Sequence, residues 1–246
     1  MPHILPPGGA VDWPADEGTI GVVGVAPWAT IDFLRALYAQ VSATRDWHYP
    51  RVIADINTKL PSRGRHLELG ETDPSPHIAE SIRELAAQGA TVVVVPCNTA
   101  HVLYDRWSAG ATVAVPSIID ATVGEILGHG ARRVACLSSA SLRTHDLYGA
   151  ALRRAGAQTV DIGDAGAALV SEVIAAVKLT GQAGDALIAR VRQMLVQLAR
   201  DGVDGVVLGC TELAALEPLC IEHVGRAAES NRALARAALH QAQGGR

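Results

Sequence analysis

The sequence predicts an α/β protein made of two similar halves, each with a parallel central sheet. Short apolar runs alternate with amphipathic stretches along the 246 residues, which is the pattern of βαβ units. Residues 85–97 (LAAQGATVVVVPC) and 198–210 (LARDGVDGVVLGC) share six of thirteen positions at an offset of 113. A repeat with so long a period indicates two related structural units. About half of the chain is apolar (49%), which is ample for two cores.

Six apolar runs are expected as strands. The run 91–95 is almost pure valine, as in a parallel strand buried on both faces. Because Val95 precedes a proline, it favours extended geometry, so this strand should end where Cys97 begins. Strands are expected at 19–25, 51–56, 91–95, 112–115, 133–137 and 204–208.

Helices are expected between these strands. The helix over 74–88 has a proline early and Gly89 as its stop, which is the usual asymmetry of helix ends. The polar segment 57–63 has the composition of a loop that carries function. The remaining helices are expected to open at Pro27 and continue over 31–43, and to cover 118–127, 142–155, 165–179, 185–200 and 227–241.

The order of elements predicts where the halves divide. Residues 1–18 are rich in proline and glycine and are expected to form a flexible tail. We expect the first α/β domain to contain 19–116 together with 214–246, and the second to contain 117–213. The active site is expected in the cleft between them, because open α/β sheets bind ligands at the carboxyl ends of their strands.

Composition excludes several classes of protein. A net charge of −4 and a pI near 6.1 do not fit a nucleic-acid-binding protein. No apolar run approaches the roughly 20 residues that span a membrane, and the N-terminus lacks a signal-peptide profile, so a cytoplasmic protein is expected. The four cysteines form neither a disulfide framework nor a zinc-binding spacing, so no metal site is expected. Cys136 and Cys220 are expected to be buried hydrophobic residues.

Cys97 and Cys210 occupy equivalent positions in the repeat, each at the end of a strand and before an expected helix. Unpaired N–H groups and the positive dipole end at a helix start lower a thiol pKa and bind carboxylates. Asn98, Thr99 and Thr211 are therefore candidates for holding a carboxylate. One cysteine after a strand is more often a packing residue, but two at equivalent positions favour catalysis.

Two thiols facing one pocket suit inversion of an α-carbon. This reaction requires a base on one face and an acid on the other, with donors that stabilise the carboxylate as negative charge develops. No glycine-rich dinucleotide motif or Walker loop is present, and no feature demands pyridoxal phosphate. We therefore expect the protein to need no cofactor.

The motifs Pro96-Cys97-Asn98-Thr99-Ala100-His101 and Gly209-Cys210-Thr211-Glu212-Leu213 resemble those of the cofactor-independent aspartate/glutamate racemase superfamily. The chain is most similar to the aspartate racemase branch, over essentially everything after Gly18. This resemblance implies two α/β domains with the active site between them, commonly in a homodimer. It also implies that Cys97 and Cys210 exchange the α-proton of a small-molecule amino acid.

The same resemblance bears on the substrate. Aspartate racemases carry an Ile-Pro-Asp-Arg loop and a lysine late in a helix of the second domain; the matches here are Leu60-Pro61-Ser62-Arg63 and Lys178. It implies that these two cations hold the distal carboxylate, a role that suits both side chains. Asn57 is the one asparagine kept from an asparagine-rich stretch that precedes the arginine in the family, and the resemblance implies that it also binds the substrate. Aspartate, and after it glutamate, is the expected substrate.

The chain departs from the family pattern at positions expected around the pocket. Its first loop, 24–30, is shorter and has fewer glycines, Trp28 lies in this loop, and Glu229-Ser230 replaces an aspartate followed by serine or threonine. These departures leave maleate cis-trans isomerisation, hydantoin racemisation and malonate decarboxylation open as reactions of the same scaffold. A non-catalytic carboxylate-binding or thiol redox protein is a further alternative. Neither His101 nor His145 is expected to be catalytic.

Overall fold

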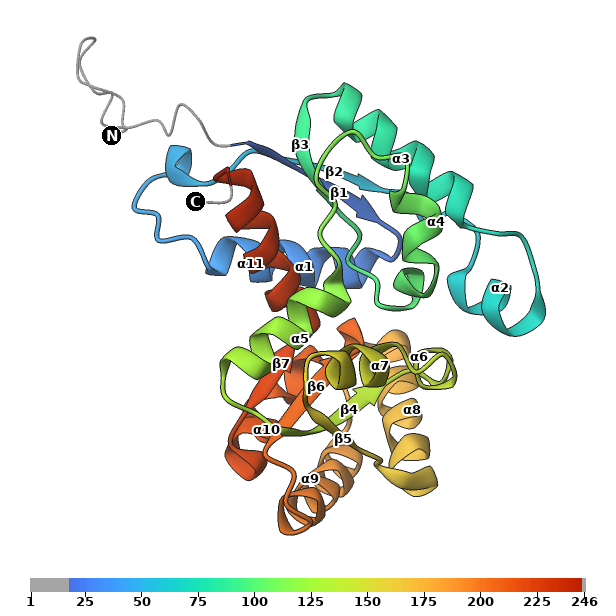
Figure 1. Cartoon of the computed structure of the whole chain (residues 1–246), viewed down its shortest axis with the longest axis vertical. Coiled ribbons are helices and arrows are strands. Elements are labelled where there is room, and N and C mark those ends of the chain that lie inside the picture. Colours follow the sequence, from blue (N-terminus) through green and yellow to red (C-terminus); the bar gives the residue numbers. More distant parts are fainter. Residues whose placement is uncertain (1–17, 245–246) are drawn as a thin grey trace.

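The computed structural model describes residues 18–244 and confirms the α/β class with two parallel sheets, one in each half (Figure 1). The first sheet has the strand order β2-β1-β3 and the second the order β5-β4-β6-β7, with parallel pairing throughout. The strands are β1 (Thr19–Gly24), β2 (Val52–Ile56), β3 (Ala90–Val94), β4 (Arg133–Ser138), β5 (Gln158–Val160), β6 (Gly205–Gly209) and β7 (Ala227–Glu229).

Helices cover both faces of each sheet. In the first half, α3 packs on one face and α1 with α11 on the other; in the second, α5 packs on one face and α8, α9 and α10 on the other (Figure 1). The helices are α1 (Pro27–Ala39), α2 (Arg63–Leu69), α3 (Ser75–Ala87), α4 (Tyr104–Ser108), α5 (Ile118–Gly128), α6 (Ala140–Thr144), α7 (Leu147–Arg154), α8 (Gly163–Thr180), α9 (Asp185–Arg200), α10 (Glu217–Val224) and α11 (Ser230–Ala242). Three 3-10 segments are η1 (Asp46–His48), η2 (Thr99–Leu103) and η3 (Thr211–Leu216).

The valine-rich strands are buried on both faces because neighbouring side chains enter different cores. In β3, Val92 and Val94 join a central core that continues into the second half, whereas Val93 packs on the α3 side. In β6, Val207 joins the same central core and Val206 packs among α8, α9 and α10. This alternation follows from the period of two along a strand, and the shared central core joins the halves.

The internal repeat corresponds to equivalent elements of the two halves. Gly89 and Gly202 end the preceding helices with positive φ angles of 97° and 81°, a conformation that glycine adopts without strain. Each glycine leads within a few residues into a largely buried strand, β3 or β6. Cys97 and Cys210 follow these strands, as the sequence predicted.

One expected strand is reduced, and one expected helix is broken, in the structure. The expected strand at 112–115 contributes only an isolated bridge, in which Val93 N–H donates to Ala114 O, and the chain soon reaches Pro116. The expected helix over 142–155 is divided into α6 and α7 at Asp146, whose φ is +48°. Aspartate tolerates this left-handed conformation, and Gly149 leaves the space that the Asp146 carboxylate occupies.

The return to the first half comes later than the predicted residue 214. Helix α10 packs on α9, and β7 pairs with β6, so the segment 217–229 belongs to the second half. Only α11 then packs back on α1, β1 and β3. The helix expected from residue 227 begins at Ser230, because Glu229 accepts hydrogen bonds from the N–H groups of Asn231 and Arg232 and so caps α11.

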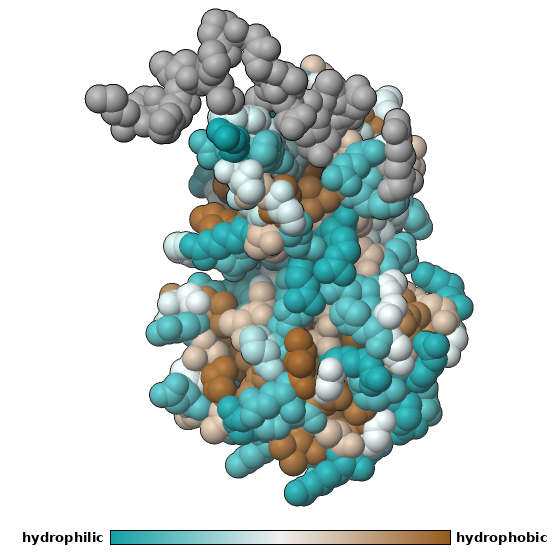
Figure 2. Space-filling view, turned by 90° about the vertical axis from the view of Figure 1, so that its left-hand side faces the viewer, coloured by the Kyte–Doolittle hydropathy of each residue, from teal (hydrophilic) through white to brown (hydrophobic). Residues whose placement is uncertain are grey.

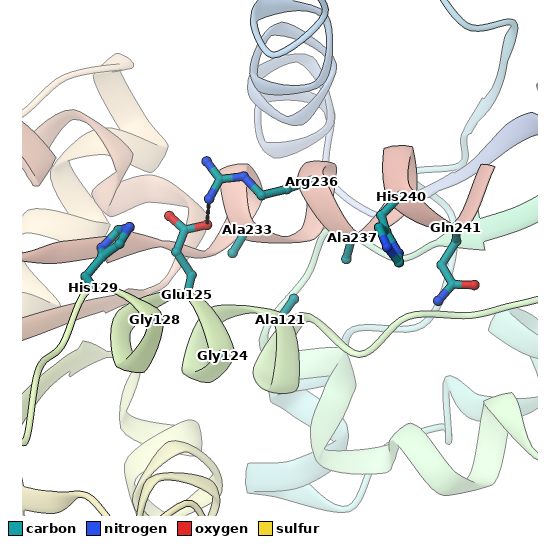
Figure 3. A pocket seen from close by; sticks show the side chains of 10 residues that line it. All are labelled: Ala121, Gly124, Glu125, Gly128, His129, Ala233, Arg236, Ala237, His240 and Gln241. Atoms are coloured by element: carbon teal, nitrogen blue, oxygen red, sulfur yellow. Dashed lines mark ion pairs between the residues drawn. The ribbon is translucent and has the colours of Figure 1, made fainter. Parts of the chain in front are cut away.

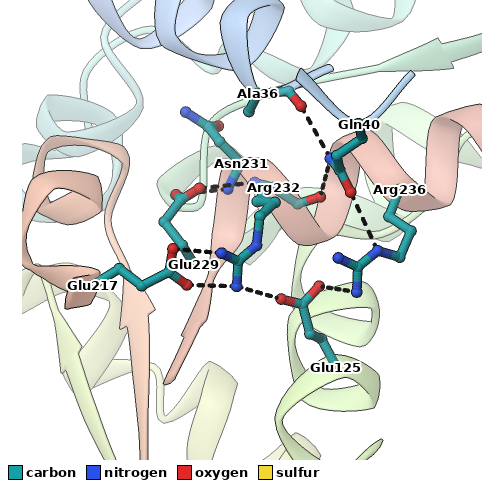
Figure 4. Close-up of polar contacts among 8 residues, drawn as sticks. All are labelled: Ala36, Gln40, Glu125, Glu217, Glu229, Asn231, Arg232 and Arg236. Atoms are coloured by element: carbon teal, nitrogen blue, oxygen red, sulfur yellow. Dashed lines mark hydrogen bonds and ion pairs between the residues drawn. The ribbon is translucent and has the colours of Figure 1, made fainter. Parts of the chain in front are cut away.

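A cluster of charged residues ties α11 to the second half (Figure 4). Arg232 binds Glu217 at the start of α10 and Glu125 on α5, at 2.5 and 2.9 Å. Arg236 forms an ion pair with the other oxygen of Glu125 at 3.1 Å, and its Nε donates to Oε1 of Gln40, the residue after α1, at 3.2 Å. Because Glu125 is buried, losing either arginine would leave a poorly compensated charge at the junction.

Hydrophilic residues cover most of the face in Figure 2, with small hydrophobic patches between them. Within residues 18–244, no helix is long and apolar enough to cross a membrane. The expected tail lies outside the described residues except for Gly18, whose N–H donates to Ala242 O at 2.7 Å.

Candidate active site

A pocket of about 250 Å³ lies between the two halves and contains both candidate cysteines. Its lining comes from the carboxyl ends of β3 and β6, from α2, and from the segment after β4. Seven of the eight site residues predicted from the sequence line it: Arg63, Cys97, Asn98, Thr99, Lys178, Cys210 and Thr211.

Asn57 is the predicted site residue that the structure does not bring to the pocket lining. Its side-chain Oδ1 accepts a hydrogen bond from Lys59 N–H at 3.0 Å. This bond to the backbone two residues on is an Asx-turn, which directs the side chain to its own loop. Trp28 also lies outside the lining and is 69% exposed, whereas Ala26 and Ala29 from the same segment contribute to the pocket wall.

Each cysteine directly precedes or adjoins a short 3-10 segment instead of an α-helix. Cys97 and Asn98 come before η2, and Cys210 is the residue before η3. These segments have five and six residues, so they supply few aligned peptide dipoles. The strand–cysteine–helical turn order is therefore as predicted, but the dipole at each cysteine is weaker than a long helix would provide.

The environment of Cys210 contradicts the prediction of a lowered thiol pKa. Burial, reinforced by the Glu212 carboxylate, raises the pKa of Cys210 well above its ordinary value. The Cys210 Sγ–H donates to Glu212 Oε2 at 2.9 Å, and Thr211 Oγ1 donates to the same oxygen at 3.1 Å. Cys210 is thus held as a protonated thiol beside a carboxylate that can receive its proton.

His101 fixes the backbone at Cys97 and has a structural role. Its Nδ1–H donates to Cys97 O at 2.9 Å, and its Nε2 accepts from Ile118 N–H at 3.2 Å. These partners require the neutral ring, and burial lowers the pKa of His101 to about 4. The ring stacks on Tyr104, with 5.4 Å between centroids, and meets the edge of Trp107. His145 lies outside the candidate pocket.

Asn98 is held from both halves by residues far away in the sequence. The Tyr148 hydroxyl on α7 donates to Asn98 Oδ1 at 2.6 Å, and Asn98 Nδ2 donates to Ser230 Oγ at 2.9 Å. All three side chains are buried, and Gly209 makes room for the tyrosine ring, because an added Cβ there would lie 2.4 Å from Tyr148 Cε2. These bonds fix the plane of the Asn98 amide, so its side chain and backbone are held rigidly in the pocket wall.

Arg63 begins α2 and reaches the pocket with part of its guanidinium unpaired. Two of its terminal N–H groups donate to Val25 O at 3.1 Å and Pro61 O at 3.2 Å. Its Nε is buried and has no hydrogen-bond partner among residues 18–244. No carboxylate of the described chain pairs with this guanidinium, so its charge is available to an anionic ligand.

Lys178, near the end of α8, faces Glu212 across 3.8 Å. Its side chain is 62% exposed, whereas that of Glu212 is 17% exposed. The lysine therefore partly balances the carboxylate beside Cys210, a contact that the sequence prediction did not include. Glu212 belongs to the Gly209–Leu213 motif, and its place two residues after Cys210 is the sequence feature that could have indicated this contact.

Three further lining residues were not predicted from the sequence. Glu68 lies on α2, and Ser139 and Ser141 follow β4, whose carboxyl end faces the pocket. Ser141 Oγ donates to Glu68 Oε1 at 2.6 Å, so this contact joins the two halves beside the cysteines. No sequence motif contains these residues, and Glu68 lies 73 positions before Ser141, so only the fold brings them together.

A larger cavity of about 850 Å³ lies between α5 and α11 (Figure 3), but its lining has no cysteine. Small residues, among them Ala121, Ala233 and Ala237, face each other there, and Glu125 pairs with Arg236. Both candidate cysteines therefore lie in the smaller pocket. Over residues 18–244, no group of three or more His, Cys, Asp or Glu side chains is arranged to hold a metal ion.

Comparisons with known proteins identify the family of the chain. Residues 20–238 match the model of the family described as Asp/Glu/Hydantoin racemase. The broad specificity amino-acid racemase RacX of Bacillus subtilis is 26% identical over 207 residues, which cover 80% of this chain and 86% of that protein.

Solved structures show the same fold. The aspartate racemase of Picrophilus torridus superposes with a TM-score of 0.76 at 23% identity, covering 92% of this chain and 94% of that one. An aspartate racemase homologue from Pyrococcus horikoshii gives a TM-score of 0.75 at 24% identity, with coverage of 92% and 99%. The family match spans nearly the whole described chain, so the protein belongs to the Asp/Glu/Hydantoin racemase family and is an isomerase of the racemase type.

Proposed function

We propose that this racemase interconverts L- and D-aspartate, with glutamate as a second substrate, without pyridoxal phosphate. The observation that carries the proposal is one small pocket lined by Cys97 from the first half and Cys210 from the second. Arg63 and Lys178 line the same pocket and can receive a distal carboxylate. A cavity of about 250 Å³ suits a small amino acid better than a bulky one.

The proton transfer uses the two thiols on opposite faces of the α-carbon. In one direction the Cys97 thiolate removes the α-proton, and the Cys210 thiol donates a proton to the other face. In the reverse direction Cys210 first gives its proton to Glu212 Oε2, which lies 2.9 Å from its Sγ. The Cys210 thiolate then removes the α-proton, and the Cys97 thiol donates a proton to the opposite face. The charge of Glu212 also raises the pKa of Cys210, so the thiolate forms only transiently, and the nearby Lys178 ammonium favours it.

The α-carboxylate is held where negative charge develops as the α-carbon loses its proton. Asn98, Thr99 and Thr211 offer backbone and side-chain donors at the ends of β3 and β6. Fixed donors at this position stabilise the carbanion-like transition state more than the substrate, which is what accelerates the reaction. The bonds from Tyr148 and to Ser230 keep Asn98 in place.

The pairing of Lys178 with Glu212 adds neutral amino acids to the candidate substrates. A lysine already facing a carboxylate attracts a distal carboxylate less strongly than a free one. The relative from Bacillus subtilis is described as a broad-specificity amino-acid racemase, which is consistent with a weak demand for an acidic side chain.

The substrate proposal is tested by incubating the purified protein with single L-amino acids without added cofactor and measuring the D-enantiomer by chiral chromatography. Aspartate, glutamate, alanine and serine form a sufficient panel. The proposal expects aspartate to have the highest kcat/KM, followed by glutamate. A higher kcat/KM for alanine or serine than for aspartate contradicts the acidic assignment, and no racemisation of any of them points to the hydantoins of the family description.

A homodimer remains a proposal from the family resemblance. Light scattering coupled to size-exclusion chromatography distinguishes the 25.7 kDa monomer from a dimer of twice that mass.

A further inference from the structure

The candidate pocket has a third polar wall that the proton transfer does not use, formed by Glu68, Ser139 and Ser141. Ser141, which is buried, donates to Glu68 Oε1 at 2.6 Å from the opposite half. Ser139 Oγ is buried and has no hydrogen-bond partner among the described residues. Buried hydroxyls are normally paired, so an unpaired one in a pocket wall indicates the place of a ligand atom.

Racemisation sets a geometric requirement on this pocket. The α-carbon carries a hydrogen, a carboxylate, an ammonium group and a side chain, and only the hydrogen changes faces. The other three groups can keep their positions in both enantiomers only if each has its own partner in the pocket. Asn98, Thr99 and Thr211 are proposed for the carboxylate, and Arg63 with Lys178 for the side chain. The ammonium group still lacks a partner.

Among residues 18–244, only Glu68 and Glu212 bring carboxylates to the pocket lining, and Glu212 is already engaged. Glu212 accepts from Cys210 and Thr211 at Oε2 and faces Lys178 at Oε1. Glu68 accepts one hydrogen bond, from Ser141, at Oε1. Its Oε2 has no hydrogen bond or ion pair within residues 18–244, so this oxygen is free to receive a cationic group.

We propose that Glu68 and Ser139 form the subsite for the substrate α-ammonium group, with Ser141 as a positioning residue that orients the Glu68 carboxylate. This inference rests on the proposed function, because it takes the substrate to be an amino acid. Helix α2 then carries two substrate partners of opposite charge, Arg63 at its first residue and Glu68 near its end.

The subsite has a consequence for selectivity. A dicarboxylate that lacks the ammonium group brings no cation to Glu68 and meets its negative charge without compensation. The pocket should therefore prefer aspartate to succinate, which has the same two carboxylates but no amino group. This difference between two ligands isolates the contribution of the ammonium contact.

The test measures the dissociation constants of L-aspartate, D-aspartate and succinate by isothermal titration calorimetry at pH 7.5, with Cys97→Ser as the background so that the enantiomers are not interconverted during the titration. Glu68→Gln keeps the size of the side chain and an oxygen that accepts from Ser141. It is expected to lower the affinity for both aspartate enantiomers roughly tenfold, which is the effect of losing a charged hydrogen bond in a partly exposed place. The affinity for succinate should stay the same or increase. Ser141→Ala should give a smaller loss with the same preference for aspartate.

Glu71→Gln is the matched control, because Glu71 is exposed, pairs with Arg65 and lies outside the pocket. It should leave all three affinities unchanged. A Glu68→Gln protein that loses affinity for aspartate and succinate equally, or for neither, overturns the inference. If the wild-type protein racemises another amino acid instead, the aspartate assignment fails separately, and that amino acid and its desamino acid become the pair measured.

Discussion

Acidification should destabilise the fold through His101. The ring is buried and neutral, and burial lowers its pKa from 6.5 to about 4. Between these values the unfolded chain binds more protons than the folded one, so stability is complete above pH 6.5 and is lost as the pH falls toward 4. From pH 7.5 to pH 5 this linkage removes about 2 kcal/mol from the free energy of unfolding.

The assay is urea unfolding of wild-type and His101→Gln protein at pH 7.5 and pH 5, followed by circular dichroism. The substitution costs stability at both pH values, because it removes the ring that packs between Tyr104 and Trp107. The informative quantity is the pH dependence, and the variant should lose about 2 kcal/mol less than the wild type on acidification.

Other titrating groups contribute equally to both proteins and cancel in this comparison. Glu229 is one of them: burial raises its pKa from 4.5 to about 7, so its effect on stability has the opposite sign and reduces stability as the pH rises through that range. An equal loss of stability in wild-type and His101→Gln protein would refute the assignment of His101 as a buried neutral residue.

Three further substitutions test the supports of the pocket. Tyr148→Phe leaves Asn98 Oδ1 without its donor and should lower the free energy of unfolding by about 1–3 kcal/mol and reduce kcat; unchanged values of both would contradict the role of this bond. Glu212→Gln removes the proton acceptor of Cys210 and should lower kcat/KM about 100-fold, equally in both directions since enantiomers have an equilibrium constant of one. Chiral analysis from each enantiomer measures this, and a loss below threefold would exclude Glu212 from the proton transfer. Gly209→Ala pushes a methyl group against the Tyr148 ring and should cost about 1–3 kcal/mol in urea unfolding, whereas unaltered stability would show that the ring can move freely.

The sequence predicted the parts of the fold that depend on local patterns. Valine runs and glycine stops indicated β3 and β6, and the repeat indicated that Cys97 and Cys210 hold equivalent places. Three-residue strands such as β7 carry too little periodicity to be distinguished from the start of a helix, so the second half was predicted to end too early. The break at Asp146 depends on the positive φ angle of this residue, which the helical pattern of the neighbouring residues does not indicate.

The site was predictable where motifs carry the chemistry, and unpredictable where tertiary contacts determine it. Both cysteines, Arg63 and Lys178 line one pocket, as the motifs and the family resemblance indicated. The pKa of Cys210 was predicted in the wrong direction, because its burial and the nearby Glu212 outweigh a short 3-10 turn. The contacts that hold Asn98 and the contact that orients Glu68 join residues at least 50 positions apart in the sequence.

The central claim is that two thiols, one from each half, exchange the α-proton. It is tested most directly by proton NMR of L-aspartate and of D-aspartate in D2O with wild-type, Cys97→Ser and Cys210→Ser protein, with chiral chromatography of the same samples. The wild type should replace the α-hydrogen of both enantiomers by deuterium and interconvert them, and each serine variant should lose the interconversion. A variant that lacks either thiol and still forms the opposite enantiomer at the wild-type rate would contradict the two-thiol mechanism.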